Sequence, residues 1–268
     1  MASDSSASPL QLTLLGTGTS TGVPMLGCDY DALDTSDPRD RRTRCSAFLS
    51  APGGTLLIDT TPDLWHQAHR EQLRRVDAVL FTHAHADHIM GFDDLRGFCL
   101  HQQQSMPIYG SAATLTAIQG FFHYAFGPTP ETYGYVHAVP HVVDGPFELA
   151  GLRIVPLPAP HGSLTTYGYL FELGGTKRAA YLSDVAEVPP PVREALQGVG
   201  TLVIDGLREQ PHPTHLCIDS AIEVAREVGA GITYLTHLTH HRRHQEREAD
   251  LPRDVPVRLA YDGLRLDI

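Results

Sequence analysis

The feature that most constrains this chain is the segment FTHAHADHI at residues 81–89, which continues an apolar run of strand length, VDAVLFT, at residues 76–82. Its ligand-type side chains follow the pattern HxHxDH and are His83, His85, Asp87 and His88. Neutral imidazole and carboxylate bind zinc, manganese, iron and other divalent ions. Ligands at alternate positions converge only where the backbone turns sharply, so we expect a loop after a buried strand that holds half of a two-metal site. An ordinary histidine-rich loop is the alternative.

The overall negative charge makes a nucleic-acid-binding function less favourable. The chain has 268 residues, a hydrophobic content of 42% and a formal net charge of −11. This hydrophobic content supplies a substantial core, whereas the negative charge disfavours broad attraction to a nucleic-acid backbone. One cluster of positive charge, DPRDRRTR, contains Arg39, Arg41, Arg42 and Arg44. Because aspartates interrupt the run from Arg39 to Arg44, both a solvated loop and a phosphate-facing cluster stay open.

The cysteines, at positions 28, 45, 99 and 217, form no CxxC pair. We therefore expect neither a disulfide framework nor a cysteine-rich zinc module, and a reducing compartment fits. The first residues, MASDSSASP, lack the basic and apolar stretches of a secretion signal, and no run of about 18 apolar residues occurs. We expect a cytoplasmic protein without a membrane partner.

Short apolar runs alternate with helical patterns and Gly/Pro turns along the chain. The expected strands are 10–15, 47–50, 55–59, 76–82, 152–157, 168–173, 178–182, 201–205 and 232–236. The expected helices are 62–73, 190–197 and 217–228. The two halves share a similar order of elements without a sequence repeat or a long linker. We therefore expect one α/β domain over residues 1–268, with packed sheets and outer helices.

Three strand ends in the second half carry further ligand-type residues. Asp184 closes the run AAYLSD and His237 closes ITYLTH, whereas His161 follows RIVPLPAP. The prolines and the glycine around His161 predict an irregular loop there. An α/β sheet gathers side chains from distant parts of the chain at one edge, so we expect these residues to join the HxHxDH loop. Taken singly, each also fits a turn or cap residue.

These motifs make the chain resemble the metallo-β-lactamase superfamily, with THAHADH for the HxHxDH motif and the later His, Asp and His in the expected order. Within it, the chain is most similar to the phosphoribosyl 1,2-cyclic phosphate phosphodiesterase branch, and more distantly to tRNA 3′-processing endonucleases. The segments that carry this closer similarity are LLGTGTSTGVPMLGC, LLIDTTPD, PLPAPHGSLTTYGYLFE, YLSD, YLTHLTHH and YDGL. The resemblance implies an α/β fold in the form of a four-layer αββα sandwich.

The resemblance also implies a ligand set for two divalent metal ions, with zinc or manganese expected and iron or nickel open. The first ion is expected at His83, His85 and His161. The second is expected at Asp87, His88 and His237, with Asp184 bridging both ions. Two such ions bind one water between them, lower its pKa to about 7 and neutralise charge on a phosphate oxygen.

The resemblance extends to residues beside the metal ligands. Asp59, at the end of TLLID, is expected to orient the HxHxDH loop by accepting a hydrogen bond, and a strand-end turn residue is the alternative. Asp87 and His215 are the expected catalytic residues; His215 matches the position that donates a proton to the departing oxygen or binds phosphate, with helix-entry packing as its alternative. His212 has no matched position. The turn GTGTST at residues 16–21 either approaches a phosphate or is a tight loop.

The sequence differs from the pattern of this branch at one place, a structural zinc site that phosphonate-pathway relatives form with CxCxxC and a histidine. Here Cys28 and His240 remain, but Tyr30 and Leu33 occupy the other two cysteine positions. One thiolate and one imidazole do not close a tetrahedral site, so we expect this extra zinc to be absent. This difference also weakens the inference that the chain acts on the same substrate as those relatives.

The leading function is a metal-dependent hydrolase, a phosphodiesterase that cleaves a small cyclic or nucleotide-like phosphate ester. One alternative is an RNA-processing endonuclease of the tRNA 3′-end type, which needs a basic surface that this chain offers only in the interrupted arginine run. The other is a thioester hydrolase on the same scaffold. The expected partner is a small phosphate-ester substrate; nucleic acid is not expected, and a homodimer stays open.

Overall fold

The computed structural model describes residues 10–29, 36–127 and 135–268. Within these residues the strands form two mixed sheets of seven strands each. The first sheet has the order β14-β1-β2-β3-β4-β5-β6, with β1 Gln11–Gly16, β2 Ser46–Ala51, β3 Gly54–Ile58, β4 Ala78–Leu80, β5 Met106–Gly110, β6 Ala138–Val142 and β14 Leu264–Asp267. The second has the order β13-β12-β11-β10-β9-β8-β7, with β7 Phe147–Leu149, β8 Leu152–His161, β9 Leu164–Leu173, β10 Thr176–Leu182, β11 Thr201–Asp205, β12 Ile232–Thr236 and β13 Val257–Leu259.

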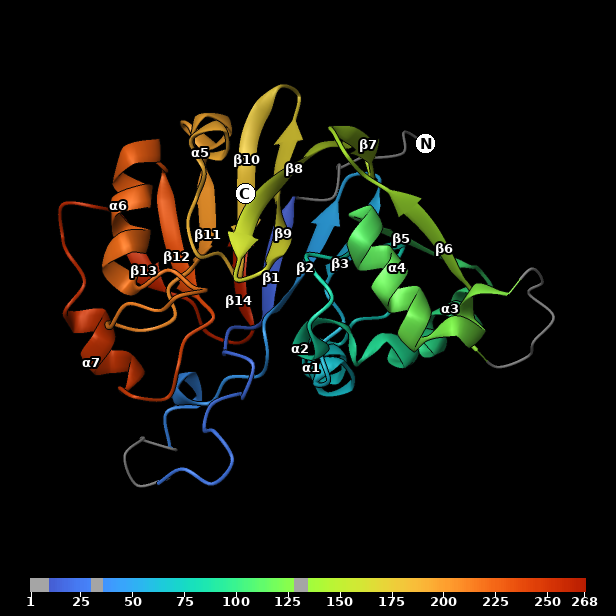
Figure 1. The fold of residues 1–268 in the computed structure, drawn as a ribbon, viewed down its shortest axis with the longest axis horizontal. Helices are drawn as coiled ribbons and strands as arrows, with labels where there is room; N and C mark the ends of the chain where they lie inside the picture. Colours follow the sequence, from blue (N-terminus) through green and yellow to red (C-terminus); the bar gives the residue numbers. More distant parts are fainter. Residues whose placement is uncertain (1–9, 30–35, 128–134) are drawn as a thin grey trace, which may run out of the picture.

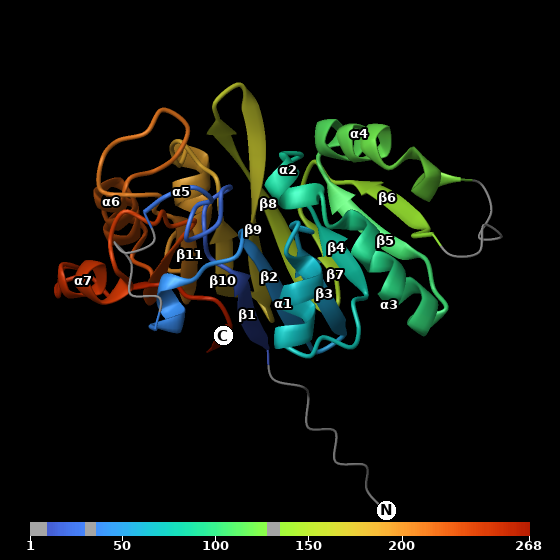
Figure 2. The ribbon, with the colours of Figure 1, turned by 90° about the horizontal axis from the view of Figure 1, so that it is seen from below.

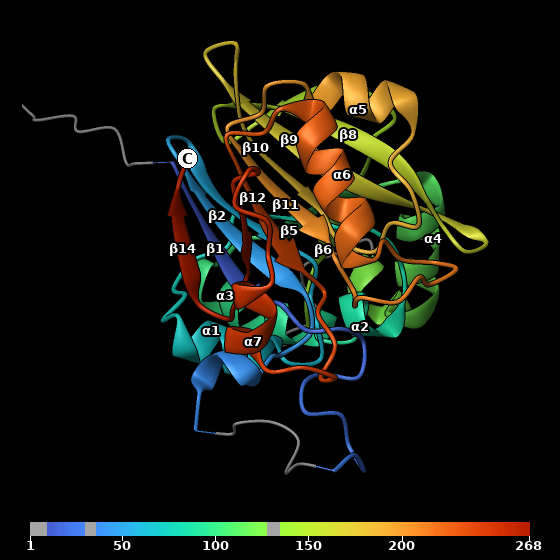
Figure 3. The same ribbon diagram turned by 90° about the vertical axis from the view of Figure 1, so that its left-hand side faces the viewer.

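Helices cover the two outer faces of this pair of sheets (Figure 1). Those beside the first sheet are α1 Leu64–Arg70, α2 Ala86–Ile89, α3 Leu95–Gln102 and α4 Ala112–Phe121, with the 3-10 turns η3 Phe92–Asp94 and η4 His123–Phe126. Those beside the second sheet are α5 Pro190–Leu196, α6 Ile218–Val228 and α7 His244–Ala249, and the turn η2 Pro38–Asp40 precedes β2. Figure 2 shows the two groups of helices on opposite sides of the strands, and Figure 3 shows α5 and α6 lying over the second sheet. No helix among the described residues has both the length and the apolar character needed to span a bilayer.

Three buried clusters of apolar side chains separate the four layers. The cluster between the sheets includes Leu49 and Ile58 of the first sheet and Phe171 and Tyr181 of the second. A second cluster joins the outer face of the second sheet to α5 and α6, and a third joins the outer face of the first sheet to α1, α3 and α4. Because both faces of each sheet are covered, their strands need apolar side chains on both faces. The four-layer αββα sandwich expected from the sequence is confirmed.

Local sequence explains where the longer helices begin and end. Ser111 caps α4, since its side chain accepts a hydrogen bond from the backbone N–H of Thr114 at 3.1 Å. Gly229 ends α6 in the left-handed conformation, with φ of 60°, and its N–H bonds back to the last turn. The expected helices 190–197 and 217–228 agree with α5 and α6 to within one residue at each end, whereas the expected helix 62–73 is shortened to α1.

The structure corrects the expectation of an irregular loop around His161, which is the last residue of β8. The prolines of this strand, Pro156, Pro158 and Pro160, lie two residues apart and pair with β9. The N–H of Tyr167, the partner of Pro158, points away from β8 and donates to the backbone oxygen of Thr82 at 2.9 Å, so these two residues form a pair that exchanges no hydrogen bond. Proline is tolerated at such positions because the ladder does not use its missing N–H. The alternating prolines therefore extend the strand and deliver His161 at its end.

Candidate metal centre

Three strand ends hold ligand-type residues in an unusual backbone conformation. Asp59 follows β3, Asp184 follows β10 and His237 follows β12, with φ of 60°, 56° and 58°. Residues other than glycine adopt this left-handed region rarely and at a cost in free energy, and such positions cluster at functional sites. The conformation turns each side chain out of the direction of its strand. All three residues are buried.

The imidazoles of His83, His85 and His161 face one another and form the first group of candidate ligands. One ligand atom of each lies within 4.8 Å of the others. Nδ1 of His85 is 2.9 Å from Nε2 of His83 and 3.2 Å from Nε2 of His161. Burial, and then the positive charge of neighbouring groups, lowers the pKa of His83 well below its ordinary value. The neutral form that burial favours is the one that binds a metal ion.

Asp87, His88, Asp184 and His237 form the second group, again with ligand atoms within 4.8 Å of one another. Nε2 of His88 is 3.2 Å from Oδ2 of Asp184, and Nε2 of His237 is 3.1 Å from Oδ1 of Asp184. Although burial opposes it, the adjacent His237 and His88 lower the pKa of Asp184 well below its ordinary value. Asp184 is thus held as a carboxylate, and one of its oxygens also lies within 4.8 Å of a ring nitrogen of His161 in the first group.

The donor set fits divalent metal ions. Within the described residues, Nε2 of His88, Nε2 of His237 and Oδ2 of Asp184 are buried and make no hydrogen bond. Buried polar atoms without a partner are costly, and an ion that accepts lone pairs from imidazole and carboxylate satisfies all three. The chemistry of these donors fits divalent ions, whereas the number and identity of the ions, and the roles of the individual ligands, stay predictions.

Two candidate ligands, His161 and His88, form hydrogen bonds through the ring nitrogen that points away from the centre of the cluster. Nδ1 of His161 donates to the backbone oxygen of Thr214 at 2.8 Å. Nδ1 of His88 donates to Oδ2 of Asp59 at 2.7 Å, and the N–H and hydroxyl of Thr82 donate to the same carboxylate, each at 2.8 Å. Such contacts select one tautomer and one orientation, leaving Nε2 of both histidines for the centre of the cluster. Asp59 therefore lies where the sequence led us to expect it, beside the HxHxDH loop.

His215 lies next to the two ligand groups. One of its ring nitrogens is within 4.8 Å of ligand atoms of His161 and Asp184, and its ring stacks on that of His237 with centroids 4.6 Å apart. Its Nδ1 donates to Oδ2 of Asp205 at 2.7 Å. Asp205 is fully buried and also accepts the backbone N–H of Val185 at 3.0 Å. The sequence reasoning missed Asp205; the available signal was that TLVID ends in aspartate as TLLID does.

His212 lies near this pair but is occupied locally. Its Nδ1 accepts the N–H of Thr214 at 3.4 Å and lies 3.2 Å from the hydroxyl of Thr214.

The pocket that contains the candidate ligands has a volume of about 420 Å³ and is not lined by His212. Ser20, Ser163 and Leu164 also line this pocket, and all three are exposed. Figure 2 shows α2, which carries the end of the HxHxDH motif, close to the end of the β8–β9 hairpin.

The glycines of GTGTST allow close packing of backbones. A Cβ atom on Gly16 would lie 1.9 Å from the backbone oxygen of Arg44, and one on Gly18 would lie 2.8 Å from Cβ of Arg42. Only glycine fits such an approach. These contacts support the tight-loop interpretation, and Ser20 is the residue of this turn that lines the pocket.

The arginine run is mostly engaged within the chain. Arg39 pairs with Asp37 at 2.7 Å, and Arg44 pairs with Asp63 at 2.9 Å. Arg42 is buried and donates to the hydroxyl of Thr17 at 2.7 Å. Because only Arg41 has neither an ion pair nor a side-chain hydrogen bond within the described residues, the run does not form a broad free cationic surface.

The expected absence of a structural zinc concerns a segment that is only partly described. Tyr30 and Leu33 lie outside the described residues. Within the described part of the chain, no cluster of three or more candidate ligands contains Cys28 or His240. The absence of this zinc stays a prediction.

Comparisons with known proteins agree with the observed fold. A crystal structure described as a new diphosphatase from the PhnP family superposes with a TM-score of 0.86 and 38% identity, covering 97% of this chain and 98% of that one. Among curated proteins, an octanoyltransferase of Porphyromonas gingivalis is 36% identical over 259 residues, which are 95% of this chain and 51% of the relative. The chain thus spans about half the length of that relative. A ribonuclease Z of Bradyrhizobium diazoefficiens is 25% identical over 198 residues, covering 70% of this chain and 64% of the relative.

The match to a family model covers the core of both sheets. The model described as the beta-lactamase superfamily domain matches residues 55–238, which include every candidate metal ligand. The resemblance inferred from the HxHxDH motif and the later strand ends is therefore confirmed. This chain belongs to the metallo-β-lactamase superfamily of metal-dependent hydrolases.

Proposed function

We propose that the chain is a phosphodiesterase that holds two divalent ions and cleaves a small cyclic or nucleotide-like phosphate ester. The observation that carries this proposal is the pair His215–Asp205, joined at 2.7 Å and lying beside the candidate ligands His161 and Asp184. Cleavage of a phosphodiester produces a strongly basic alkoxide, so a positioned proton donor speeds the reaction. The similarity to a diphosphatase at 38% identity supports a substrate that contains phosphate.

The protein residues have distinct parts in this proposal. His83, His85 and His161 would hold one ion, and Asp87, His88 and His237 the other, with Asp184 between them. Bound ions of this kind lower the pKa of a coordinated water and neutralise charge on a phosphate oxygen.

His215 would hold a proton on Nε2, directed at the departing oxygen. Its Nδ1–H is committed to the carboxylate of Asp205. That carboxylate keeps the ring in place, with Nε2 free for the reacting centre. Asp87, whose carboxylate borders the pocket, would act both as ligand and at the reacting centre.

The lining of the pocket supports a small substrate. Among the described residues that line it there is no lysine or arginine, and its volume is about 420 Å³. Tracking a nucleic-acid backbone needs several cationic side chains, and the chain as a whole carries a net charge of −11. A phosphate ester with small polar substituents suits a pocket of this volume without lysine or arginine better than RNA does. We therefore propose a small phosphate ester as the partner, and neither nucleic acid nor a membrane.

A thioester hydrolase is the second candidate, because the relative from Porphyromonas gingivalis is named an octanoyltransferase. Acyl transfer and thioester cleavage both proceed by attack on a carbonyl carbon, which the same ligand set would serve. The name belongs to a chain about twice as long, and the matching part covers 51% of it. The endonuclease alternative has support from the ribonuclease Z relative at 25% identity.

Parallel assays separate these candidates. Purified protein loaded separately with zinc and manganese is tested on bis-(p-nitrophenyl) phosphate, cyclic phosphates, an acyl thioester and a tRNA precursor. We expect turnover of the phosphodiesters that stops in chelator and is lost in Asp184→Asn. Turnover of the thioester alone would contradict the proposal in favour of the second candidate. Cleavage of the tRNA precursor at low salt, without turnover of small esters, would favour the endonuclease.

A further inference from the structure

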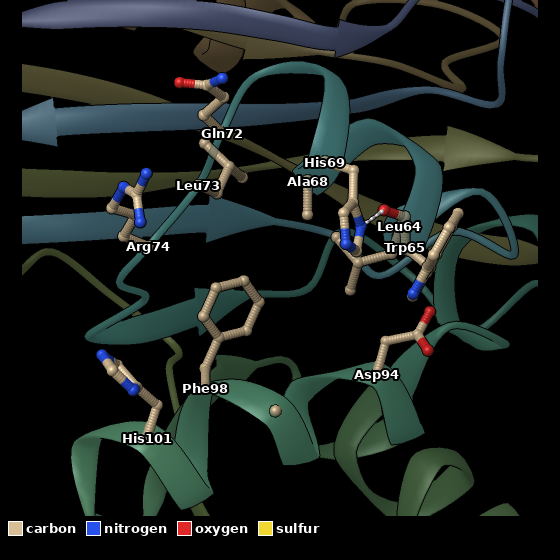
Figure 4. Close-up of a pocket in the computed structure, with 11 residues that line it drawn as sticks. Leu64, Trp65, Ala68, His69, Gln72, Leu73, Arg74, Asp94, Phe98 and His101 are labelled. Carbon is tan, nitrogen blue, oxygen red and sulfur yellow. Dashed lines mark hydrogen bonds between the residues drawn. The ribbon is translucent and has the colours of Figure 1, made fainter.

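A second pocket, separate from the metal centre, lies between α1 and α3. We call it the α1/α3 pocket; it has a volume of about 600 Å³ and shares no lining residue with the pocket of the candidate ligands. Figure 4 shows side chains of α1 and α3, among them Leu64, His69 and Phe98, on opposite sides of a common space, whereas Gln72 on the turn after α1 points away from it. The lining residues used below are Trp65, Leu73, Arg74, Asp94, Phe98 and His101. This volume lies within the range of small-molecule sites.

The wall of the α1/α3 pocket is aromatic and exposed. Trp65 is the single tryptophan of the chain, and 62% of its surface is exposed to solvent. His69 holds it from one side: the ring centroids are 4.1 Å apart, and Nδ1 of His69 donates to the backbone oxygen of Trp65 at 2.8 Å. Leu73 and Phe98 complete the apolar surface. A large aromatic side chain that stays exposed above an apolar hollow is typical of binding sites.

The charged groups of this pocket differ between its two ends (Figure 4). Asp94 lies at the end near Trp65, and its carboxylate accepts the backbone N–H of Trp65 at the start of α1. Arg74 and His101 lie at the other end. Within the described residues, Arg74 is exposed and makes neither an ion pair nor a side-chain hydrogen bond, whereas Arg75 pairs with Asp77 at 2.6 Å. Within the described residues, the carboxylate of Asp94 therefore has a hydrogen-bond partner, whereas the guanidinium of Arg74 has none.

We propose that the α1/α3 pocket binds a small amphipathic carboxylate. An aromatic or alkyl body packs on Trp65, Leu73 and Phe98, and the carboxylate receives hydrogen bonds from Arg74. Guanidinium is suited to this head group because its N–H groups match the two oxygens of a carboxylate. His101 lies on the same side and adds a further donor. Because this site and the metal centre share no lining residue, the inference does not depend on the proposed hydrolase activity.

Trp65 makes the proposal directly measurable, since all tryptophan fluorescence of the protein comes from this pocket. The folded protein is titrated with phenylbutyrate and, separately, with phenylbutanol, which has the same body without the charge. We expect a saturable change in emission with phenylbutyrate and roughly tenfold weaker binding of phenylbutanol, the scale of one charge-assisted contact. Equal binding of both compounds, or no saturable change with either, would overturn the proposal.

Matched variants separate the site from general effects on the fold. Arg74→Gln should weaken phenylbutyrate binding roughly tenfold, with phenylbutanol unaffected, whereas Arg75→Gln should change neither. Gly97 lines the pocket and Gly120 lies in α4, and a Cβ on either meets no atom within 4 Å. Gly97→Leu should therefore block binding, and Gly120→Leu should leave it intact with the same helix content.

Undiminished binding in both Arg74→Gln and Gly97→Leu would show that the carboxylate sits elsewhere. Phosphodiesterase assays on the same variants keep the two proposals apart. We expect Arg74→Gln to turn over bis-(p-nitrophenyl) phosphate at the rate of the unmodified chain. Failure of the hydrolase proposal would thus leave the fluorescence result unchanged, and the reverse also holds.

Discussion

Nδ1 of His88 lies 2.7 Å from Oδ2 of Asp59, and both side chains are fully buried. The two residues are 29 positions apart: Asp59 directly follows β3, and His88 lies in α2, which follows β4. These two strands are parallel neighbours in the first sheet. Their contact joins the HxHxDH loop to the adjacent strand end. It directs Nε2 of His88 at Asp184, which comes from the other sheet.

Asp59→Asn should reduce metal affinity roughly 10- to 100-fold, because the amide no longer stabilises the tautomer that leaves Nε2 of His88 free. The measurement is competition for zinc with a chromophoric chelator. Asp77→Asn, at the other end of β4, is the matched control and should keep the affinity of the unmodified chain. Identical affinities in both variants would remove the orienting role of Asp59.

His85→Ala and Asp184→Asn should each abolish turnover while the protein stays folded. His85 is exposed, so its removal costs little packing, and asparagine tolerates the left-handed backbone of residue 184. Activity is measured together with bound metal and far-ultraviolet circular dichroism. Near-normal activity in either variant would contradict the assignment of these side chains to the metal centre.

Asp205→Asn should lower kcat roughly 100- to 10,000-fold with a smaller change in KM, because Nδ1 of His215 then lacks the carboxylate that fixes the tautomer and orientation of the ring. His215→Ala should cost about as much, and the double variant should be little worse than either single one. Losses that add fully in the double variant would mean that the two residues act separately. Metal content is the control and should equal that of the unmodified chain.

The acid stability of the protein should depend on His244. Its Nδ1 lies 2.9 Å from Nη2 of Arg42 and must accept, because guanidinium only donates. Burial and the charge of Arg42 lower the pKa of His244 from 6.5 to about 4. As the pH falls below 6.5 the unfolded chain binds the proton first, so the free energy of unfolding should fall until about pH 4.

Urea titrations between these two pH values measure this dependence. His244→Gln should flatten it, because the amide does not titrate. The same slope in the variant would assign the acid sensitivity to other groups.

Gly16→Ala should lower the free energy of unfolding by about 1–3 kcal/mol or more, because its Cβ would lie 1.9 Å from the backbone oxygen of Arg44. The matched control is Gly120→Ala in α4, where a Cβ meets no atom within 4 Å. Alanine should raise stability there by about 0.5–1 kcal/mol. Chemical denaturation of both variants tests the pair, and a neutral Gly16→Ala would refute the close approach of the two backbones.

Apolar periodicity in consecutive residues correctly predicted the central strands and two of the helices. The central strands and the helices 190–197 and 217–228 were identified because apolar periodicity and capping are written in consecutive residues. Short or partly exposed strands such as β6, β7 and β14 carry too few apolar positions for such a signal, and none was predicted.

His161 shows where local reasoning misleads. Prolines at alternate positions favour a loop when only the neighbouring residues are considered. In the structure β8 nevertheless pairs with β9, because the hydrogen bonds between these strands do not need the N–H groups that the prolines lack. Asp205 was likewise not assigned a role, since only the fold brings it to His215.

The amino-acid sequence alone determined the kind of chemistry, because the HxHxDH motif concentrates imidazole and carboxylate within a few residues after one strand. The tertiary structure alone decided how those groups meet. Parallel strands from two sheets end at a common edge, where the left-handed residues Asp184 and His237 contact each other and the left-handed Asp59 contacts His88. Ligand type is a property of a residue, whereas convergence depends on backbone direction and on packing between segments distant in the chain.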